Sequence, residues 1–178
     1  MAGGLSDADV IVVGAGSGGL TAAAYLAALG RRVIVVDRSE GSLELARDCG
    51  ADETLIADGN EVASVRERTD GHGAEAVIDF VGEGGALEDS IAMLRDGGSH
   101  YVVGYGGVLT IPAIDIISAE ISFVGNLVGS YNDLAELMTL EAEGKVKLHT
   151  STYPLAAAND AMDDLDQGRL HGRGILIP

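Results

Sequence analysis

Three glycines, Gly14, Gly16 and Gly19, form the stretch of this sequence whose residue types and spacing point most directly to chemistry. They match the pattern G-x-G-x-x-G, which on its own is a weak signal. Here the pattern follows a short apolar run, residues 9–13, and opens a stretch of small residues, 17–29, that is typical of a helix. A strand, a glycine turn and a helix in this order indicate a loop that binds a diphosphate.

Each position of this turn has a physical task. Gly14 allows a tight turn out of the strand, Gly16 lets the backbone approach a diphosphate, and Gly19 lets the helix lie against the sheet. We expect the free N–H groups of the helix N-terminus, near Ser17 and Gly18, to face the diphosphate and to supply a partial positive charge.

An acidic residue follows at the distance that this pattern requires. Asp37 ends a second apolar run, residues 32–36, and lies 23 residues after Gly14. Its carboxylate can accept hydrogen bonds from both hydroxyls of an adenosine ribose and would repel a 2′-phosphate, which favours NAD over NADP. Arg38 leaves binding of NADP open, because its guanidinium can either stack on adenine or accommodate a 2′-phosphate.

Other interpretations of the glycine turn also stay open. It can serve packing only, in a non-catalytic scaffold, or it can belong to an FAD-binding module. A methyltransferase shares the glycine turn and the acid, but the second half of the chain gives it no support. A P-loop is excluded, since no Gly-Lys-Ser/Thr follows and no lysine is there for the phosphates.

Composition limits the class of protein. The chain has 178 residues, 47% hydrophobic and 22% charged, which suits one compact domain with a core. A formal net charge of −17 would repel phosphate backbones and anionic lipid, so we expect no nucleic-acid or membrane partner. No apolar run approaches the roughly 18 residues of a membrane span, and the N-terminus does not resemble a signal peptide. We therefore expect a cytoplasmic protein.

Apolar runs and helical spacings alternate along the chain. The strands are predicted at 9–13, 32–36, 54–57, 74–81, 99–104 and 121–128, and the helices at 17–29, 39–49, 60–68, 84–95 and 131–143, with Ser39 and Asn60 as caps. This order predicts an α/β fold, a doubly wound parallel sheet (Rossmann fold) with helices on both faces.

The chain is expected to divide into three parts. Residues 1–8 are predicted to form a flexible N-terminal tail and 9–147 the dinucleotide-binding Rossmann domain. Residues 148–178 are predicted to form a C-terminal strand–helix–strand extension. This extension either adds strands to the edge of the sheet or belongs to a partner domain outside this chain.

From about Ser39 to the C-terminus, the chain resembles the nucleotide-binding domain and C-terminal segment of medium-chain, zinc-type, NAD-dependent alcohol dehydrogenases. The segments that carry the resemblance are LELARDCGAD (43–52), GAEAVIDFVG (73–82), LRDGGSHYVVG (94–104) and GRGILIP (172–178). Residues 9–37 instead resemble the first βαβ unit of FAD-dependent oxidoreductases. This combination suggests a chimera, a design or a truncated piece.

The resemblance implies further cofactor contacts. Phe80 and Val81, at the end of the fourth strand, would flank the adenosine side and the nicotinamide ribose. Val103 and Gly104, at the end of the fifth, would approach the nicotinamide, and the backbone of 125–127 would meet its carboxamide. All these positions lie at the carboxyl ends of strands, where open α/β sheets bind ligands. Ordinary core packing is the alternative role of the three apolar residues.

No catalytic or metal-binding residue is predicted. The resembled family binds zinc through Cys, His and Glu of an N-terminal catalytic domain, which is not recognisable here. Cys49 lies at a helix end, and the four histidines have no ligand-like spacing, so each is expected in a solvated loop or at a strand edge: His72, His100, His149 and His171. No tyrosine has a lysine four residues on, unlike the pair of short-chain dehydrogenases.

The expected function is binding of an adenine dinucleotide, NAD(H) or alternatively FAD, as the cofactor domain of an alcohol-dehydrogenase-type oxidoreductase. Hydride transfer needs an oriented substrate as well as a cofactor, so we expect little or no turnover from this chain alone. The resemblance also implies a homodimer, because the strand at 121–128 corresponds to a sheet edge that pairs across a two-fold axis in that family. Its apolar run would be a hazard if left exposed.

Overall fold

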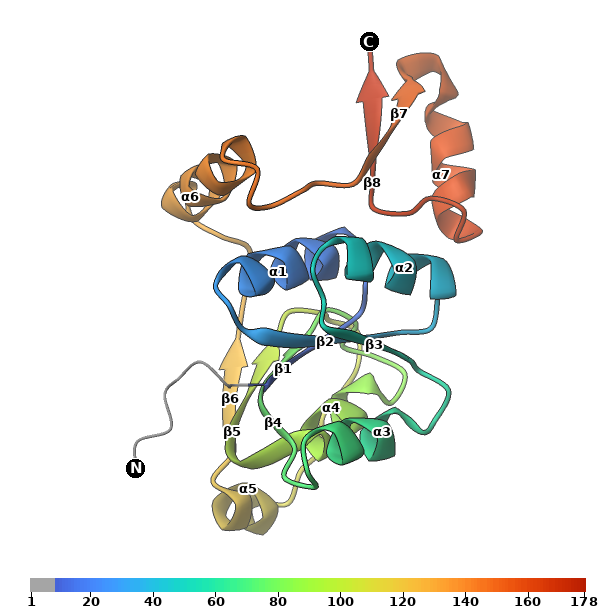
Figure 1. Cartoon of the computed structure of the whole chain (residues 1–178). Coiled ribbons are helices and arrows are strands. Elements are labelled where there is room, and N and C mark those ends of the chain that lie inside the picture. The colour runs from blue at the N-terminus through green and yellow to red at the C-terminus, as the bar shows by residue number, and fades with distance from the viewer. Residues whose placement is uncertain (1–8) are drawn as a thin grey trace.

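Six parallel strands form the main sheet of the computed structural model, which describes residues 9–178 (Figure 1). Their order is β3-β2-β1-β4-β5-β6, so the direction of winding reverses between β1 and β4. The strands are β1 (Asp9–Val13), β2 (Arg32–Asp37), β3 (Glu53–Ile56), β4 (Ala74–Asp79), β5 (Leu94–Val102) and β6 (Ser122–Gly125). The predicted doubly wound parallel sheet is confirmed. The predicted tail, residues 1–8, lies outside the described residues.

Helices cover both faces of this sheet, as predicted (Figure 1). α1 and α2 pack on one face with α6 beside them, and α3 and α4 pack on the other. Val12 and Val35 point into the first core cluster, whereas Ile11 and Ile34 point into the second. Because β1 and β2 are buried on both faces, their sequences are continuous apolar runs. The helices are α1 (Ser17–Ala28), α2 (Glu40–Asp48), α3 (Glu61–Arg68), α4 (Ala86–Ala92), α5 (Ala113–Ala119) and α6 (Tyr131–Ala142).

The ends of the first helices follow local rules of sequence. Gly30 (φ 73°) follows α1 and Gly50 (φ 98°) follows α2, both in the left-handed region that favours glycine. Ser39 caps α2 as predicted, since its side chain accepts a hydrogen bond from the Ser42 N–H. Asn60 precedes α3, but its side chain makes no capping hydrogen bond, so that prediction is wrong.

The second half of the sheet differs more from the prediction. The helix predicted at 84–95 is confined to α4, and β5 begins five residues before the predicted strand at 99–104. The register of β5 against β4 shifts, and residues 95–98 are the irregularity, because two of them are glycines that tolerate a bulge. β4 ends at Asp79 and β6 at Gly125, so both are shorter than predicted.

One helix was absent from the prediction. α5 is rich in isoleucine, a β-branched residue that is more typical of strands. The sequence therefore gives no clear helix signal for this segment. In the described part of the chain, no helix combines the length and the apolar character that crossing a bilayer needs.

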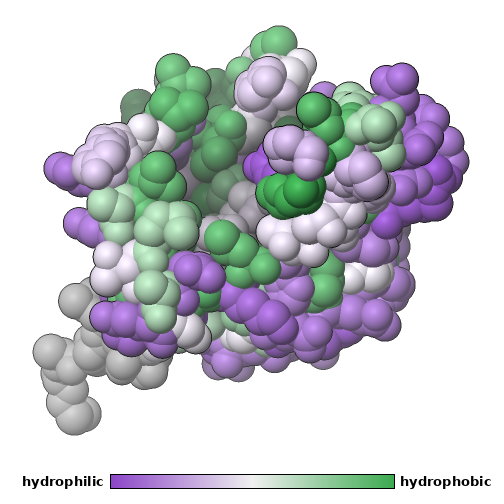
Figure 2. Space-filling model, turned by 90° about the horizontal axis from the view of Figure 1, so that it is seen from above, coloured by the Kyte–Doolittle hydropathy of each residue, from purple (hydrophilic) through white to green (hydrophobic). Residues whose placement is uncertain are grey.

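The last part of the chain forms a small separate sheet. β7 (Thr150–Pro154) and β8 (Arg173–Ile177) pair in parallel and are connected through α7 (Ala158–Asp166), so the first of the two alternatives, that they add strands to the edge of the main sheet, is wrong. This unit lies over the N-terminal ends of α1 and α2 (Figure 1). Figure 2 looks down on the molecule from this side and shows hydrophobic side chains gathered on that face. The large exposed hydrophobic residues of the C-terminal unit are Leu155, Met162, Leu165, Ile175, Leu176 and Ile177. The predicted domain limits stay predictions.

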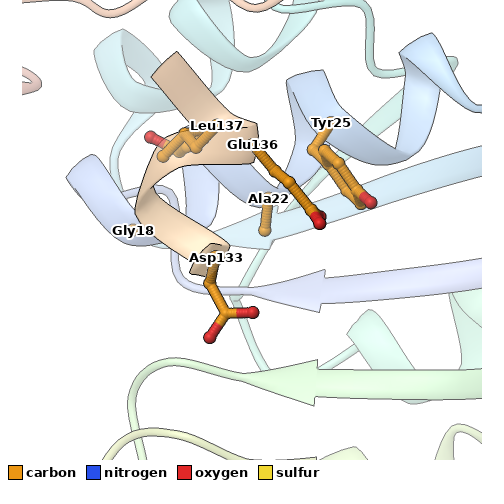
Figure 3. Close-up of a pocket in the computed structure, with 7 residues that line it drawn as sticks. Gly18, Ala22, Tyr25, Asp133, Glu136 and Leu137 are labelled. Atoms are coloured by element: carbon orange, nitrogen blue, oxygen red, sulfur yellow. The ribbon is translucent and has the colours of Figure 1, made fainter. Parts of the chain in front are cut away.

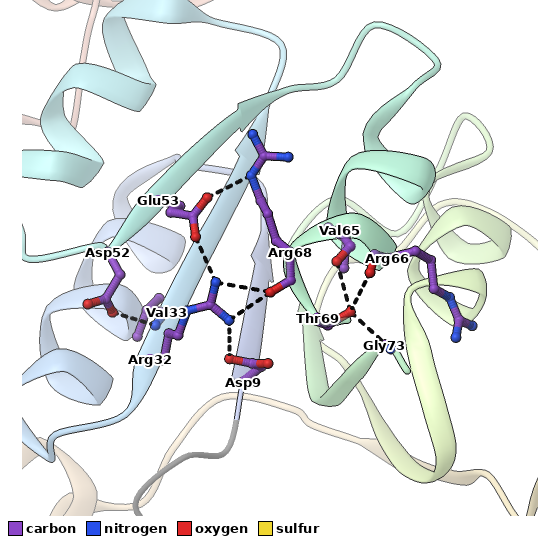
Figure 4. A network of polar contacts seen from close by, with 10 residues as sticks. All are labelled: Asp9, Arg32, Val33, Asp52, Glu53, Val65, Arg66, Arg68, Thr69 and Gly73. Carbon is purple, nitrogen blue, oxygen red and sulfur yellow. Dashed lines mark hydrogen bonds and ion pairs between the residues drawn. The ribbon is translucent and has the colours of Figure 1, made fainter. Parts of the chain in front are cut away.

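An ion-pair network closes the amino ends of the first strands (Figure 4). Arg32 of β2 pairs with Asp9 of β1 at 2.6 Å and with Glu53 of β3 at 2.7 Å, and it donates to the carbonyl oxygen of Arg68. Arg68 in turn pairs with Glu53 at 2.6 Å. The hydrogen bond with Asp9, and then that with Glu53, raises the pKa of Arg32. One guanidinium therefore joins three strands to the end of α3.

The substitution Arg32→Ala is expected to lower the free energy of unfolding by about 1–3 kcal/mol, because it removes the cation that pairs with Asp9 and one of the two that pair with Glu53. Urea denaturation measures the change. Arg47→Ala, at an exposed position of α2, is the control and should change stability by less than about 0.5 kcal/mol. Equal losses in both variants would contradict the role of the network.

Candidate functional site

The glycine turn between β1 and α1 has two positions that exclude a side chain. Gly14 has a φ of 93°, and a Cβ there would lie 2.9 Å from Cγ2 of Val81. A Cβ at Gly19 would lie 1.8 Å from the carbonyl oxygen of Gly14, so the backbone of α1 rests directly on the turn. This geometry agrees with the packing tasks predicted for both glycines.

Gly16, by contrast, faces open space. It is the N-cap of α1, and a Cβ there would have no heavy atom within 4 Å. Among the described residues, none caps α1 with its side chain. The first N–H groups of an α-helix lack partners within the helix, so those near Ser17 and Gly18 are available to an anion.

Two basic residues that were not predicted lie beside this helix N-terminus. Lys147 and Arg173 line a hollow of about 370 Å³ together with Ser17 and Thr21. Arg173 also lines a second hollow of about 550 Å³ with Gly16 and Ser17. Lys147 lies in the segment between α6 and β7, and Arg173 is the first residue of β8, so the course of the chain after α6 brings both cations to α1. The one signal for Arg173 in the sequence is its place in the GRGILIP segment.

Asp37, at the end of β2, holds the glycine turn by hydrogen bonds. Its Oδ2 accepts from the Ala15 N–H at 2.6 Å, and its Oδ1 accepts from the Ser39 N–H at 2.7 Å. The carboxylate is half-buried, and each oxygen keeps a further lone pair. Asp37 can therefore position the turn and still accept hydrogen bonds from the hydroxyls of a ribose.

A polar cleft of about 550 Å³ opens beside Asp37 at the carboxyl ends of the strands. Its lining includes Arg38, Val81 and four acidic residues, Asp37, Glu61, Glu83 and Asp89. Burial, followed by the charge of Glu61, raises the pKa of Asp89. The size of the cleft and its place beside β1, where the winding reverses, suit a nucleoside.

The other predicted contact residues directly follow β4 and β5. Phe80 and Val81 come after the last residue of β4, and Val103 and Gly104 after the last residue of β5. Phe80 also packs against the glycine turn, since a Cβ at Gly18 would lie 3.0 Å from its ring. Of these four residues, Val81 lines the polar cleft.

Another hollow lies on the outer side of α1, between this helix and α6 (Figure 3). It has a volume of about 370 Å³, and Tyr25, Asp133 and Glu136 contribute to its lining. Figure 3 shows Tyr25 and Glu136 projecting to the same side while Asp133 points away. Hydrogen bonds from Ser130 lower the pKa of Asp133. Two carboxylates make this hollow unsuitable for a diphosphate.

Residues 9–178 contain no group of three or more His, Cys, Asp or Glu side chains placed to hold a metal ion. Cys49 is buried, and burial raises the pKa of its thiol. His72 and His171 are exposed as predicted, but His100 is fully buried, so the prediction of a solvated histidine is wrong there. The reason is that β5 is an inner strand and that Phe123 of β6 packs edge-on against the imidazole.

The fold and this site define a Rossmann-type nucleotide-binding domain. The family model described as "Zinc-binding dehydrogenase" matches residues 19–143. Because this match spans more than half of the chain, the chain belongs to the zinc-binding dehydrogenase family.

Individual relatives agree with the family match. An NAD-dependent alcohol dehydrogenase from Sulfurisphaera tokodaii is 37% identical over 174 residues, covering 95% of this chain and 50% of the relative. A D-arabinose 1-dehydrogenase (NADP(+)) from Saccharolobus solfataricus is 30% identical, covering 96% of this chain and 50% of its own length. The crystal structure of the alcohol dehydrogenase from Aeropyrum pernix has a TM-score of 0.91 at 39% identity, covering 96% of this chain and 50% of that one. The chain thus spans about half the length of the relatives it matches.

These matches also cover the first βαβ unit. Since they include nearly all of this chain, the similarity to dehydrogenases extends before residue 38. The FAD alternative depended on that unit and receives no support from the comparisons. A chimeric origin stays a prediction.

The two kinds of glycine in the turn should respond differently to alanine. Gly19→Ala is expected to lower the free energy of unfolding by about 3 kcal/mol or more, because its Cβ would overlap the Gly14 backbone. Gly16→Ala should cost less than about 1 kcal/mol, since its Cβ points into open space. Thermal unfolding followed by circular dichroism measures both. A Gly19→Ala variant as stable as Gly16→Ala would contradict the described packing.

Proposed function

We propose that this chain binds NAD(H) and forms the cofactor-binding half of an alcohol-dehydrogenase-type oxidoreductase. The open N-terminus of α1 carries the proposal: Gly19 fixes the helix on Gly14, and the bare Gly16 leaves the first N–H groups accessible. An anionic ligand requires such groups here, because the net charge of −17 would otherwise repel it.

The diphosphate and the adenosine have matching groups around this helix. The N–H groups of Ser17 and Gly18 would bind the diphosphate, with Arg173 in the adjoining hollows as a further cation. Asp37 would accept hydrogen bonds from the adenosine ribose. Arg38 would stack on the adenine in the polar cleft.

The nicotinamide half of the dinucleotide would extend from β1, across the place where the winding of the sheet reverses, toward β4 and β5. Phe80 and Val81 would flank the adenosine side and the nicotinamide ribose, and Val103 and Gly104 would lie near the ring. When bound, the nicotinamide ring supplies hydride transfer, whereas these residues bind and orient it. In this proposal substrate choice and zinc chemistry belong to other residues, so we expect little or no turnover from this chain alone. A cytoplasmic location is compatible with this role.

Calorimetric titration is expected to show binding of NAD or NADH. Asp37→Ala should weaken the binding of NAD and NADH about tenfold or more, because the ribose hydroxyls lose a charged acceptor. It should also reduce the ratio of the affinity for NAD to that for NADP. Asp48→Ala, the same exchange at the exposed end of α2, is the control and should leave the affinity unchanged. No heat with either dinucleotide in the unmodified protein would contradict the proposal.

We also propose that the chain forms a homodimer through the segment 121–128. β6 is an edge strand of the main sheet, so one side of its backbone is unpaired within the described chain. Leu127 and Val128, which follow this strand, are 89% and 93% exposed. Pairing of two such edges across a two-fold axis would cover both residues.

Sedimentation velocity at micromolar concentration is expected to show a dimer. Leu127→Lys should shift the protein toward the monomer, because it places a charge in the apolar contact. Leu29→Lys, at an exposed position at the end of α1, should leave the dimer intact. A clean monomer in the unmodified protein would refute this proposal.

A further inference from the structure

Asp79 is a buried carboxylate at the carboxyl end of β4, where the winding of the sheet reverses. It has no exposed surface, and it pairs in register with Val13, the residue before the glycine turn, and with Val102 at the end of β5. A buried charge is costly unless hydrogen bonds compensate for the lost water. We therefore expect hydrogen bonds to compensate for the burial of Asp79 at the centre of the candidate site.

Backbone amides from two neighbouring turns bind this one residue. The Oδ1 of Asp79 accepts from the Val81 N–H at 2.8 Å and from the Gly82 N–H at 3.0 Å. Its carbonyl oxygen accepts from the N–H groups of Val103 at 2.9 Å and Gly104 at 2.8 Å. Asp79 thus fixes both the turn after β4 and the segment after β5.

These two turns contact each other and the glycine turn. A Cβ at Gly82 would lie 2.3 Å from the carbonyl carbon of Gly104, and a Cβ at Gly104 would lie 2.4 Å from that of Val81. The side chain of Val81 in turn packs on Gly14. Because such close contacts leave no free space, a shift of one turn must move the others.

The second carboxylate oxygen has no hydrogen-bond partner. Oδ2 of Asp79 lies 3.9 Å from Nε2 of His100, and both nitrogens of this imidazole and the hydroxyl of Ser90 are likewise buried without a partner. Burial lowers the pKa of His100, so the imidazole is neutral at neutral pH and no salt bridge compensates the carboxylate. The hydrogen bonds from the two backbone amides to Oδ1 are therefore the interaction that stabilises the buried side chain of Asp79.

We propose that Asp79 is a positioning residue for the dinucleotide, because its side-chain oxygen holds the turn after β4, and this turn contacts the glycine turn through Val81 and the segment after β5 through Gly82. This inference rests on the proposed function. Since the acceptor oxygen and not the negative charge does the positioning, asparagine should replace aspartate here, whereas alanine should not.

Titration of the full chain with NADH, followed by its fluorescence, tests this role. Asp79→Ala should weaken binding about tenfold or more, and Asp79→Asn should stay within about threefold of the unmodified protein. Val77→Ala removes buried volume from the same strand away from the site, so it should lower the melting temperature and leave the affinity unchanged. A folded Asp79→Ala variant with unchanged affinity would overturn the inference, as would an asparagine variant as weak as alanine or an equal loss in Val77→Ala.

Amide hydrogen exchange of the unmodified protein provides a test that needs no variant. The Val81 and Gly82 amides should exchange more slowly than those of Gly84 and Gly85, which lie further along the same loop and are exposed. Equal rates would overturn the inference even if Asp79→Ala fails to fold. Absence of NADH binding in the unmodified protein would instead refute the proposed function, and the exchange rates would still decide whether Asp79 orders the turns.

Discussion

The direct contact between the backbones of Gly19 and Gly14 is the constraint on which the candidate site depends. With hydrogen as the only side chain at Gly19, α1 can approach the end of β1 until its backbone touches the turn. This contact places the first amides of the helix at the carboxyl ends of the strands, where the winding of the sheet reverses between β1 and β4. The negative charge of the protein makes that local positive end essential, and Arg173, brought in by β8, adds to it.

Two aspartates at strand ends share a second feature. Asp37 and Asp79 both use side-chain oxygens to hold backbone amides of neighbouring turns. The glycine turn therefore has a carboxylate acceptor on the β2 side and, through Val81, an indirect support on the β4 side. Turns rich in glycine lose much conformational entropy on ordering, and these hydrogen bonds offset part of that loss before any ligand arrives.

The first two strands and the helices that follow them were predictable in detail, because their signals are local: apolar runs, the glycine turn, and Gly30 and Gly50 at helix ends. The second half was predictable only in outline. The glycines of residues 95–98 suit either a helix-to-strand turn or a bulge, and tertiary pairing with β4 selects the bulge. The burial of His100 and the approach of Arg173 to Ser17 depend on contacts between distant segments, which spacing along the chain does not encode.

A crystal structure of the protein with bound NADH would test the central claim most directly. The account predicts the diphosphate within hydrogen-bonding distance of the amide nitrogens of Ser17 and Gly18, next to the bare Gly16, with the adenosine ribose at Asp37. A dinucleotide bound elsewhere, for example between α1 and α6, or a crevice closed by the protein's own side chains would contradict it.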